Sequence, residues 1–311
     1  MSDAPRLLEV EPPEAGRRLD VFLADRLGLS RAQTRRLLAR GVVEVDGRAQ
    51  TEKAKGLSVR SGEVVAVAPF TPPAEQRALA EPDRPLVVLA EGAGWLALDK
   101  PARVAVHPLE PEEQGTLLGA LLARHPEVHG VGEGALRSGV VHRLDVDTSG
   151  VVLFATEQSR WERLRAGFAE HRVEKQYRAI ARGRLDGSGD VELPLLLARH
   201  RPARVRVATD EEASRARGVR RTALSWRALE GFADATLLEV RPVTGFLHQI
   251  RATFAHFGHP LLGDRSYGPP EARGVGRHML HAARVAFEDV EAASPDAPDF
   301  AECLARLREA S

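Results

Sequence analysis

One short segment between two apolar runs holds side chains that could carry out chemistry. It includes His142, Arg143, Asp145 and Asp147, with Thr148 next. Polar residues between two strands usually form a turn, and the Asp-Thr-Ser-Gly stretch that starts at 147 fits a turn. Asp145 differs because a histidine and an arginine lie just before it, and an ionised carboxylate near a cation can act as a base or as a nucleophile. From these residues alone, Asp145 either caps a turn or takes part in catalysis.

Three further segments carry polar or aromatic side chains where a predicted element begins or ends. Lys100 and His107 lie at a strand end and in the rigid loop after it, and Tyr177 stands at the head of another strand. A helix is predicted over residues 248–256, and its His-Gln-Ile-Arg start places Arg251 in the first turn. For Tyr177 the ordinary alternative is a core position in a strand, and for Arg251 it is the helix surface.

A metal site, a disulfide and a bound cofactor all fit the residues poorly. His248, His256 and His259 lie close in the sequence, but no carboxylate or cysteine completes a ligand set with them, so we expect no metal site. Cys303 is the single cysteine, which excludes an internal disulfide and a cysteine-based zinc site. The sequence has neither of the common glycine-rich phosphate loops, and we expect no cofactor.

The composition is that of a soluble globular protein. The 311 residues are 43% hydrophobic and 28% charged, enough for a large domain with a small one. No apolar run approaches the ~20 residues that span a bilayer, and the N-terminus lacks a signal-peptide core. We therefore expect a cytoplasmic protein without membrane contact, and a monomer because no extra apolar stripe is evident. The net charge of zero does not exclude nucleic acid, since a local basic face decides such binding.

Residues 16–67 are predicted to form a small α+β unit. Leu19, Phe22 and Leu23 have helical spacing, and a second helix is predicted from Arg31, with Ser30 as its N-cap. Strands are predicted from Val42 and toward residue 67. The second helix presents four arginines with no acid between them, a pattern typical of a solvated face or of a phosphate-binding one: Arg31, Arg35, Arg36 and Arg40.

A proline-rich stretch over residues 68–85 is predicted to be a linker, and residues 86–300 a second, larger unit. Strand-like runs in the larger unit are interrupted by helical ones without strict alternation. We therefore expect an α+β fold with a mixed, mostly antiparallel central sheet flanked by helices. The arginine-rich stretch 199–220 is expected to be an exposed connection.

Taken together, these segments resemble the RluA-like family of RNA pseudouridine synthases. The family signature His-Arg-Leu-Asp followed by Thr-Ser-Gly corresponds to residues 142–145 and 148–150, and Gly-x-x-His-Gln-Ile-Arg to 245–251. Residues 258–264 and the Leu-His-Ala at 280–282 also match family elements. The first unit resembles an S4-type RNA-binding domain, and the resemblance covers roughly residues 16–290.

The resemblance implies an isomerase that breaks the uridine N1–C1′ bond, rotates the uracil and rejoins it through C5. It assigns the catalytic carboxylate to Asp145, its cationic partner to Arg251 and the residue against the target base to Tyr177. An aromatic face can stack on a flipped base, and the tyrosine hydroxyl can transfer a proton.

The remaining family positions concern the substrate. Because a stacked uridine must be extruded before it can react, the resemblance assigns Arg143 to the vacated space and Leu280 to the base pocket. His142 is expected in the same pocket, either against the substrate or shaping the motif. In the S4-like unit, the four arginines are expected to contact RNA phosphates.

The expected partner is large-subunit (23S-type) ribosomal RNA, with transfer RNA as the alternative substrate. A role as an RNA-binding ribosome-assembly factor is the alternative of another class. The chain departs from the family pattern at Phe246-Leu247, where Arg-Thr is usual, and at Val146, where a lysine is frequent. Both departures remove polar groups near a polyanion and bear on the choice of RNA.

Overall fold

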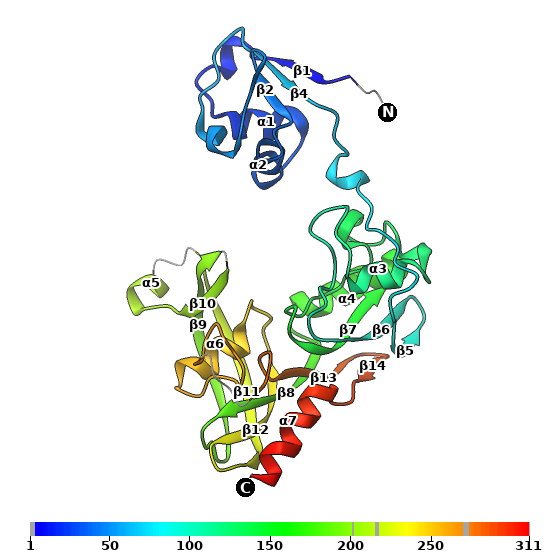
Figure 1. Ribbon diagram of the computed structural model, residues 1–311, viewed down its shortest axis with the longest axis vertical. Helices are drawn as coiled ribbons and strands as arrows, with labels where there is room; N and C mark the ends of the chain where they lie inside the picture. Colours follow the sequence, from blue (N-terminus) through cyan, green and yellow to red (C-terminus); the bar gives the residue numbers. More distant parts are fainter. Residues whose placement is uncertain (1–3, 201, 215–217, 270–273, 311) are drawn as a thin grey trace. The chain divides into compact units, whose positions relative to one another are not determined.

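The computed structural model describes residues 4–200, 202–214, 218–269 and 274–310. The chain forms two compact units, Met1–Pro73 and Ala74–Ser311 (Figure 1). Among the described residues, no helix is long and apolar enough to cross a membrane.

The first unit packs two helices on a small antiparallel sheet. The helices are α1 (Leu19–Leu27) and α2 (Arg31–Ala39), and the described strands follow the order β1 (Arg6–Glu9), β4 (Val64–Val67), β2 (Val43–Val45) and β3 (Arg48–Ala49). Ser30 caps α2 as predicted, since its hydroxyl accepts the Gln33 N–H. The predicted start at residue 16 was wrong: β1 lies before it, and its mostly exposed side chains lack the alternation that marks a strand.

The second unit is built on one large sheet. In the described chain its strand order is β10-β9-β11-β12-β8-β13-β7-β6-β5, with β14 paired to β13, and every pairing is antiparallel except that of β13 with β7. The prediction of an α+β fold with a mostly antiparallel sheet is confirmed. The strands are β5 (Val88–Gly92), β6 (Trp95–Lys100), β7 (Ser149–Ala155), β8 (Glu174–Arg182), β9 (Ser188–His200), β10 (Ala203–Val207), β11 (Val219–Gly231), β12 (Ala235–Pro242), β13 (Leu280–Phe287) and β14 (Val290–Ala293).

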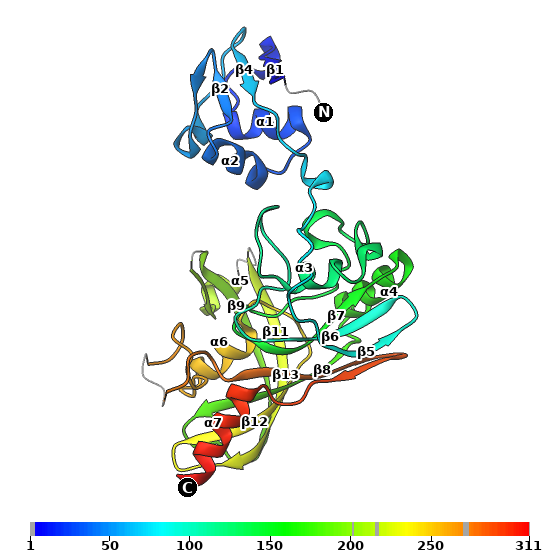
Figure 2. The same cartoon turned by 45° about the vertical axis from the view of Figure 1, so that its right-hand side comes forward.

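Helices cover both faces of this sheet, which explains its nearly continuous apolar runs. Along β7, Val152 packs in the cluster of α3 (Leu117–Leu122), whereas Leu153 packs in the cluster of α4 (Gln158–Ala169). Along β8, Ala179 packs with α6 (Gln249–His256) and Ile180 with α7 (Pro298–Glu309). Figure 2 shows α3 and α4 near β6 and β7, and α6 and α7 at the end that carries β11 and β12.

Two predictions about connecting segments require correction. Residues 74–85 of the predicted linker 68–85 belong to the second unit: Ala78 is buried, and the Glu81 carboxylate accepts the N–H of Gly115 just before α3. The stretch 199–220 is not simply an exposed connection, because it contains β10 and the short α5 (Asp210–Ser214). The Ala-Arg-Val-Arg-Val sequence of β10 has a strand-like alternation that its arginines masked; residues 201 and 215–217 lie outside the described chain.

Gly150 is the second residue of β7, just after the polar segment, at a place where a side chain does not fit. Its φ is +113°, and a Cβ there would lie 2.2 Å from the Ala282 carbonyl oxygen on β13. Gly150→Ala is expected to lower the free energy of unfolding by roughly 2–5 kcal/mol, because backbone strain and overpacking add. Denaturant unfolding of this variant and of Gly187→Ala measures the difference.

Gly187 is the matched control because it also has a positive φ, +79°, while a Cβ at this position would have no atom within 4 Å. Gly187→Ala is expected to lower the free energy of unfolding by about 1–2 kcal/mol, because it adds backbone strain but no overpacking. Equal losses in the two variants would contradict the close approach of β7 and β13.

Candidate active site

Asp145 lies in the tight loop that leads into β7. Its carbonyl accepts the Thr148 N–H at 3.0 Å, and the preceding Leu144 is buried in the core. The Asp145 side chain keeps 21% of its surface exposed. The residue thus forms the expected turn through its backbone, while its side-chain carboxylate stays partly exposed to solvent.

Lys100, at the end of β6, fixes one side of this loop. Its ammonium is fully buried and donates to the carbonyls of Pro101, Val104 and Val146 at 2.8–2.9 Å. Burial, with a smaller effect of Arg277, lowers the pKa of Lys100 to about 7. Because Val146 follows Asp145 directly, Lys100 sets the course of the backbone beside the carboxylate.

Arg277 fixes the other side of the loop, and neither it nor its neighbour was predicted as a site residue. Arg277 is buried, donates to the Asp147 carbonyl at 3.0 Å, and pairs with Asp299 at 2.7 Å. The next residue, His278, places Nε2 2.8 Å from the Thr148 hydroxyl. The sequence offers little signal for these contacts, since Arg277 binds a backbone carbonyl that any residue could supply.

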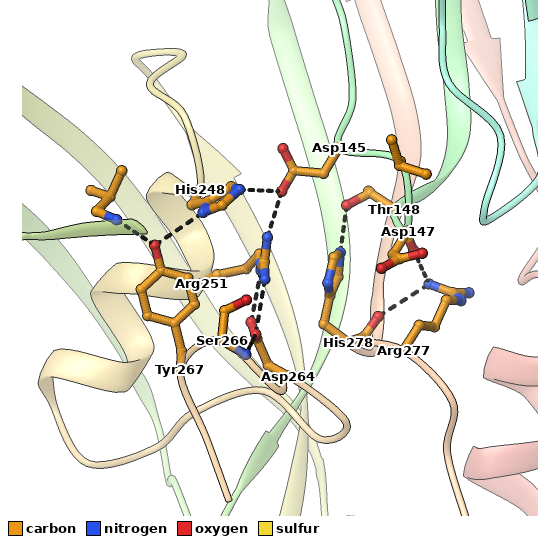
Figure 3. A network of polar contacts seen from close by, with 12 residues as sticks. Asp145, Asp147, Thr148, His248, Arg251, Asp264, Ser266, Tyr267, Arg277 and His278 are labelled. Carbon is orange, nitrogen blue, oxygen red and sulfur yellow. Dashed lines mark hydrogen bonds and ion pairs between the residues drawn. The ribbon is translucent and has the colours of Figure 1, made fainter. Parts of the chain in front are cut away.

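Asp145, Arg251 and Asp264 form a chain of charges at the start of α6 (Figure 3). Arg251 donates from Nη1 to Asp145 at 2.9 Å, and from Nε and Nη2 to Asp264 at 2.7 and 2.9 Å. Although burial opposes it, pairing with Asp264 and then with Asp145 raises the pKa of Arg251, which keeps the guanidinium charged. Asp264 is fully buried and was not predicted as a site residue, although the Gly-Asp stretch that contains it was part of the resemblance.

Tyr177, near the start of β8, is partly buried against the same pocket as Asp145. Burial, followed by the charge of Asp145, raises the pKa of its phenol, so the hydroxyl stays protonated. In the described part of the chain, this hydroxyl has no hydrogen-bond partner. A proton donor without an internal partner therefore lies beside the carboxylate.

The structure gives different surroundings to His142 and Arg143, which lie shortly before Asp145. Arg143 is exposed and makes no hydrogen bond or ion pair within the described chain, so the alternative of a salt bridge to Asp147 is not realised. His142 is fixed: Nε2 accepts the Leu153 N–H at 2.9 Å and the ring stacks on Phe168 at 4.6 Å. Burial, then Lys175 and Arg165, lowers the pKa of His142 to about 3, so the ring is neutral and shapes the motif.

The side chains around Asp145 enclose one pocket of about 670 Å³. His142, Arg143, Asp145, Tyr177, Arg251 and Leu280, the predicted residues of the larger unit, all contribute to its wall. Arg137, Arg165 and Lys175 add further basic groups that were not predicted. Within the described residues, no group of three or more His, Cys, Asp or Glu side chains is arranged to hold a metal ion.

Phe246 and Leu247 also line the pocket, and their apolar side chains pack in a small cluster beside it. They pack with Leu195 of β9, Val205 of β10 and Tyr267. This small cluster joins the β9–β10 hairpin to the start of α6. Where the family usually has the polar pair Arg-Thr, this chain therefore has two apolar side chains that line the pocket and contact the hairpin.

Two of the four arginines predicted to contact RNA, Arg31 and Arg35, form ion pairs within the first unit. The fully buried Asp20 of α1 lies 3.3 Å from Arg35 and 3.7 Å from Arg31, and also pairs with Arg18. Arg36 and Arg40 are exposed. One carboxylate thus orders several guanidinium groups that keep 40–54% of their surface exposed.

Comparison with known proteins gives consistent results. The family model described as "RNA pseudouridylate synthase" matches residues 94–256. An "Uncharacterized RNA pseudouridine synthase" of Chloroflexus aurantiacus is 38% identical over 280 residues, which cover 89% of this chain and 84% of that protein. A "Ribosomal large subunit pseudouridine synthase D" of Xanthomonas campestris pv. campestris is 34% identical over 317 residues, or 96% and 91% of the two chains.

Among solved structures, "Human RNA Pseudouridylate Synthase Domain Containing 4" is similar with a TM-score of 0.57 at 21% identity. The match covers 71% of this chain and 93% of the human one, and it shows a shared fold.

Proposed function

Since this chain belongs to the RluA-like RNA pseudouridine synthases, isomerases that act on RNA, we propose that it isomerises specific uridines of large-subunit ribosomal RNA, with Asp145 as the catalytic carboxylate. One observation carries the assignment of the residue. Asp145 is the carboxylate that lines the pocket, and Arg251 contacts it at 2.9 Å. Arg251 donates to this carboxylate, and an ionised carboxylate can act as nucleophile or base on the bound nucleotide.

The pocket is suited to a uridine that has left its stack. Tyr177 offers an aromatic face and Leu280 an apolar one, while Asp145 lies beside them in the same wall. Stacking on an aromatic side chain contributes about 1–3 kcal/mol per base. The exposed Arg143 has no partner in the described chain, so its guanidinium is available to fill the space that the extruded base leaves.

The first unit is proposed to be an S4-like domain that gives a second contact with RNA. Its α2 carries Arg31, Arg35 and Arg36, and Arg40 follows as the C-cap residue. The ion pairs with Asp20 order Arg31 and Arg35 while leaving them partly exposed. Ordered guanidinium groups suit phosphate oxygens, since less side-chain freedom is lost on binding. Relatives named for the large ribosomal subunit support ribosomal RNA as the substrate.

Pseudouridine mapping tests the substrate. Total RNA and large-subunit precursor particles from a strain that lacks the gene are incubated with the purified protein, and ribosomal and transfer RNA are mapped together. New pseudouridines in large-subunit RNA are expected. New sites in transfer RNA alone would assign the enzyme to that substrate, and tight RNA binding without any new site would favour an assembly factor over the proposal.

Two replacements of Tyr177 separate its ring from its hydroxyl. Tyr177→Phe is expected to bind RNA normally but to react about 10²-fold more slowly, because proton transfer by a positioned group contributes at least that much. Tyr177→Leu is expected to lose the same rate and in addition about tenfold in affinity, since base stacking is lost. Single-turnover rates and filter-binding affinities measure both effects; a Phe variant with the wild-type rate would remove the hydroxyl from proton transfer.

A further inference from the structure

A second polar chain reaches Asp145 from the β9–β10 hairpin, through residues that the proposed mechanism does not use. The Val205 N–H on β10 donates to the Tyr267 hydroxyl oxygen at 2.7 Å, and this oxygen lies 3.0 Å from Nδ1 of His248. Nε2 of His248 lies 3.7 Å from the Asp145 carboxylate. Figure 3 shows the imidazole between the tyrosine and the aspartate, beside Arg251.

The hydrogen bonds of Tyr267 are compatible with a His248 ring that carries its proton on Nε2. The Tyr267 oxygen accepts from Val205, so its own proton is free to be donated to Nδ1. A neutral imidazole that accepts at Nδ1 carries its proton on Nε2, the nitrogen that faces Asp145. Burial first, and then the charge of Arg251, lowers the pKa of His248 against the opposite effect of Asp145 and Asp264, which agrees with a neutral ring.

The separation of 3.7 Å is longer than a hydrogen bond, so the carboxylate accepts from Nε2 only after a small movement. Asp145 already accepts from Arg251 through Oδ2. A second donor at the same oxygen restricts the carboxylate to one orientation and leaves Oδ1 available for the substrate. Contacts that shorten when substrate binds are a common feature of catalytic groups.

The backbone of His248 supports a specific role for this side chain. The residue adopts φ 52° and ψ 19° at the start of α6, a left-handed conformation that is disfavoured for a residue with a Cβ. Such conformations persist where surrounding contacts fix them, and they gather at functional sites. Here the Tyr267 hydrogen bond is one of these contacts.

Tyr267 connects this arrangement to β10. Two guanidinium groups lie near its ring, with Arg251 at 5.2 Å and Arg204 of β10 at 5.8 Å from the ring centre. Val205 is buried in the apolar cluster that also contains Phe246 and Leu247. The position of β10 is therefore two hydrogen bonds away from the imidazole that faces Asp145.

We propose that His248 is a positioning residue which orients the Asp145 carboxylate through its Nε2 proton, and that Tyr267 fixes this tautomer and links it to β10. The inference rests on the proposed catalytic role of Asp145. It assigns a function to two residues outside the set predicted from the sequence. Phe246 and Leu247 support the same arrangement, because they pack with Val205 and Tyr267.

Glutamine and asparagine at position 248 give a matched pair of variants. The amide nitrogen of His248→Gln can occupy the place of Nε2, whereas that of His248→Asn reaches only the place of Nδ1. The Gln variant is expected to react within about threefold of the wild-type rate, and the Asn variant about 10- to 100-fold more slowly, because a misdirected catalytic group costs this much. RNA affinity is expected to stay unchanged in both.

The rate is the single-turnover release of tritium from C5-labelled uridine in a transcript of large-subunit ribosomal RNA, since C5 loses its hydrogen when it joins C1′. Tyr267→Phe keeps the ring but removes the hydroxyl, and is expected to slow this rate about tenfold without weakening RNA binding. This variant keeps the inference testable if a replacement of His248 fails to fold. His256→Gln, at the exposed end of the same helix, is the control.

Equal rates for the Gln and Asn variants, or a wild-type rate for Tyr267→Phe, would overturn the inference. A uniform loss of RNA affinity would do the same, because it would indicate a structural role. An Asp145→Asn protein with the wild-type rate would instead refute the proposed catalytic role of Asp145, whatever the other variants show.

Discussion

Asp145→Asn is expected to stop pseudouridine formation, with a single-turnover rate at least about 10³-fold below that of the wild type. The amide has the shape of the carboxylate but can neither attack nor remove a proton. Arg251 keeps its two bonds to Asp264, so the wall of the pocket should persist and RNA affinity should change little. Tritium release from the labelled transcript and mapping of RNA from a strain that lacks the gene measure the loss.

Asp147→Asn provides the control within the same loop. The contact of Asp147 with Arg277 is made by its backbone carbonyl, which the substitution leaves in place. Its rate is expected to stay within about threefold of the wild type, since surface substitutions away from such contacts usually have small effects. Product formation by Asp145→Asn at a rate similar to this control would contradict the catalytic assignment.

Arg251→Gln is expected to lower the free energy of unfolding by about 3–5 kcal/mol, because it leaves the charge of Asp264 buried without its partner. Asp264 is fully buried and takes two of the three bonds that Arg251 makes to carboxylates. The reaction is expected to slow as well, since Asp145 loses the cation at 2.9 Å. Stability and rate should therefore fall together in this variant.

A second substitution separates the two effects. In Arg251→Gln with Asp264→Asn, the buried charge is gone, and most of the lost stability should return while the rate stays low. Denaturant unfolding of the wild type, both single variants and the double variant gives the interaction energy of the pair. A double variant as unstable as Arg251→Gln would contradict the role of Arg251 in neutralising the buried Asp264. A double variant that regains the rate would contradict its role beside Asp145.

Hydrophobic periodicity was enough to predict most of the elements around the site. The predicted helix over 248–256 corresponds to α6, and the class of the fold followed from the irregular order of strands and helices. The long hairpin strands β9 and β11 were harder to find because their side chains are mostly half-exposed, which leaves a weak alternation. An edge strand such as β1 is defined by its partner more than by its own residues.

The sequence by itself determined which residue types the site contains, through motif elements that kept their order along the chain. Asp145, Tyr177 and Arg251 were identified in this way, although 106 positions separate the aspartate from the arginine. Only the tertiary structure decided their partners: Asp264 behind Arg251, Lys100 and Arg277 around the loop, and His248 with Tyr267. The reason is physical, because periodicity records which face of an element is buried, whereas a hydrogen bond depends on the distance between two chain segments and often on a backbone carbonyl that every residue possesses.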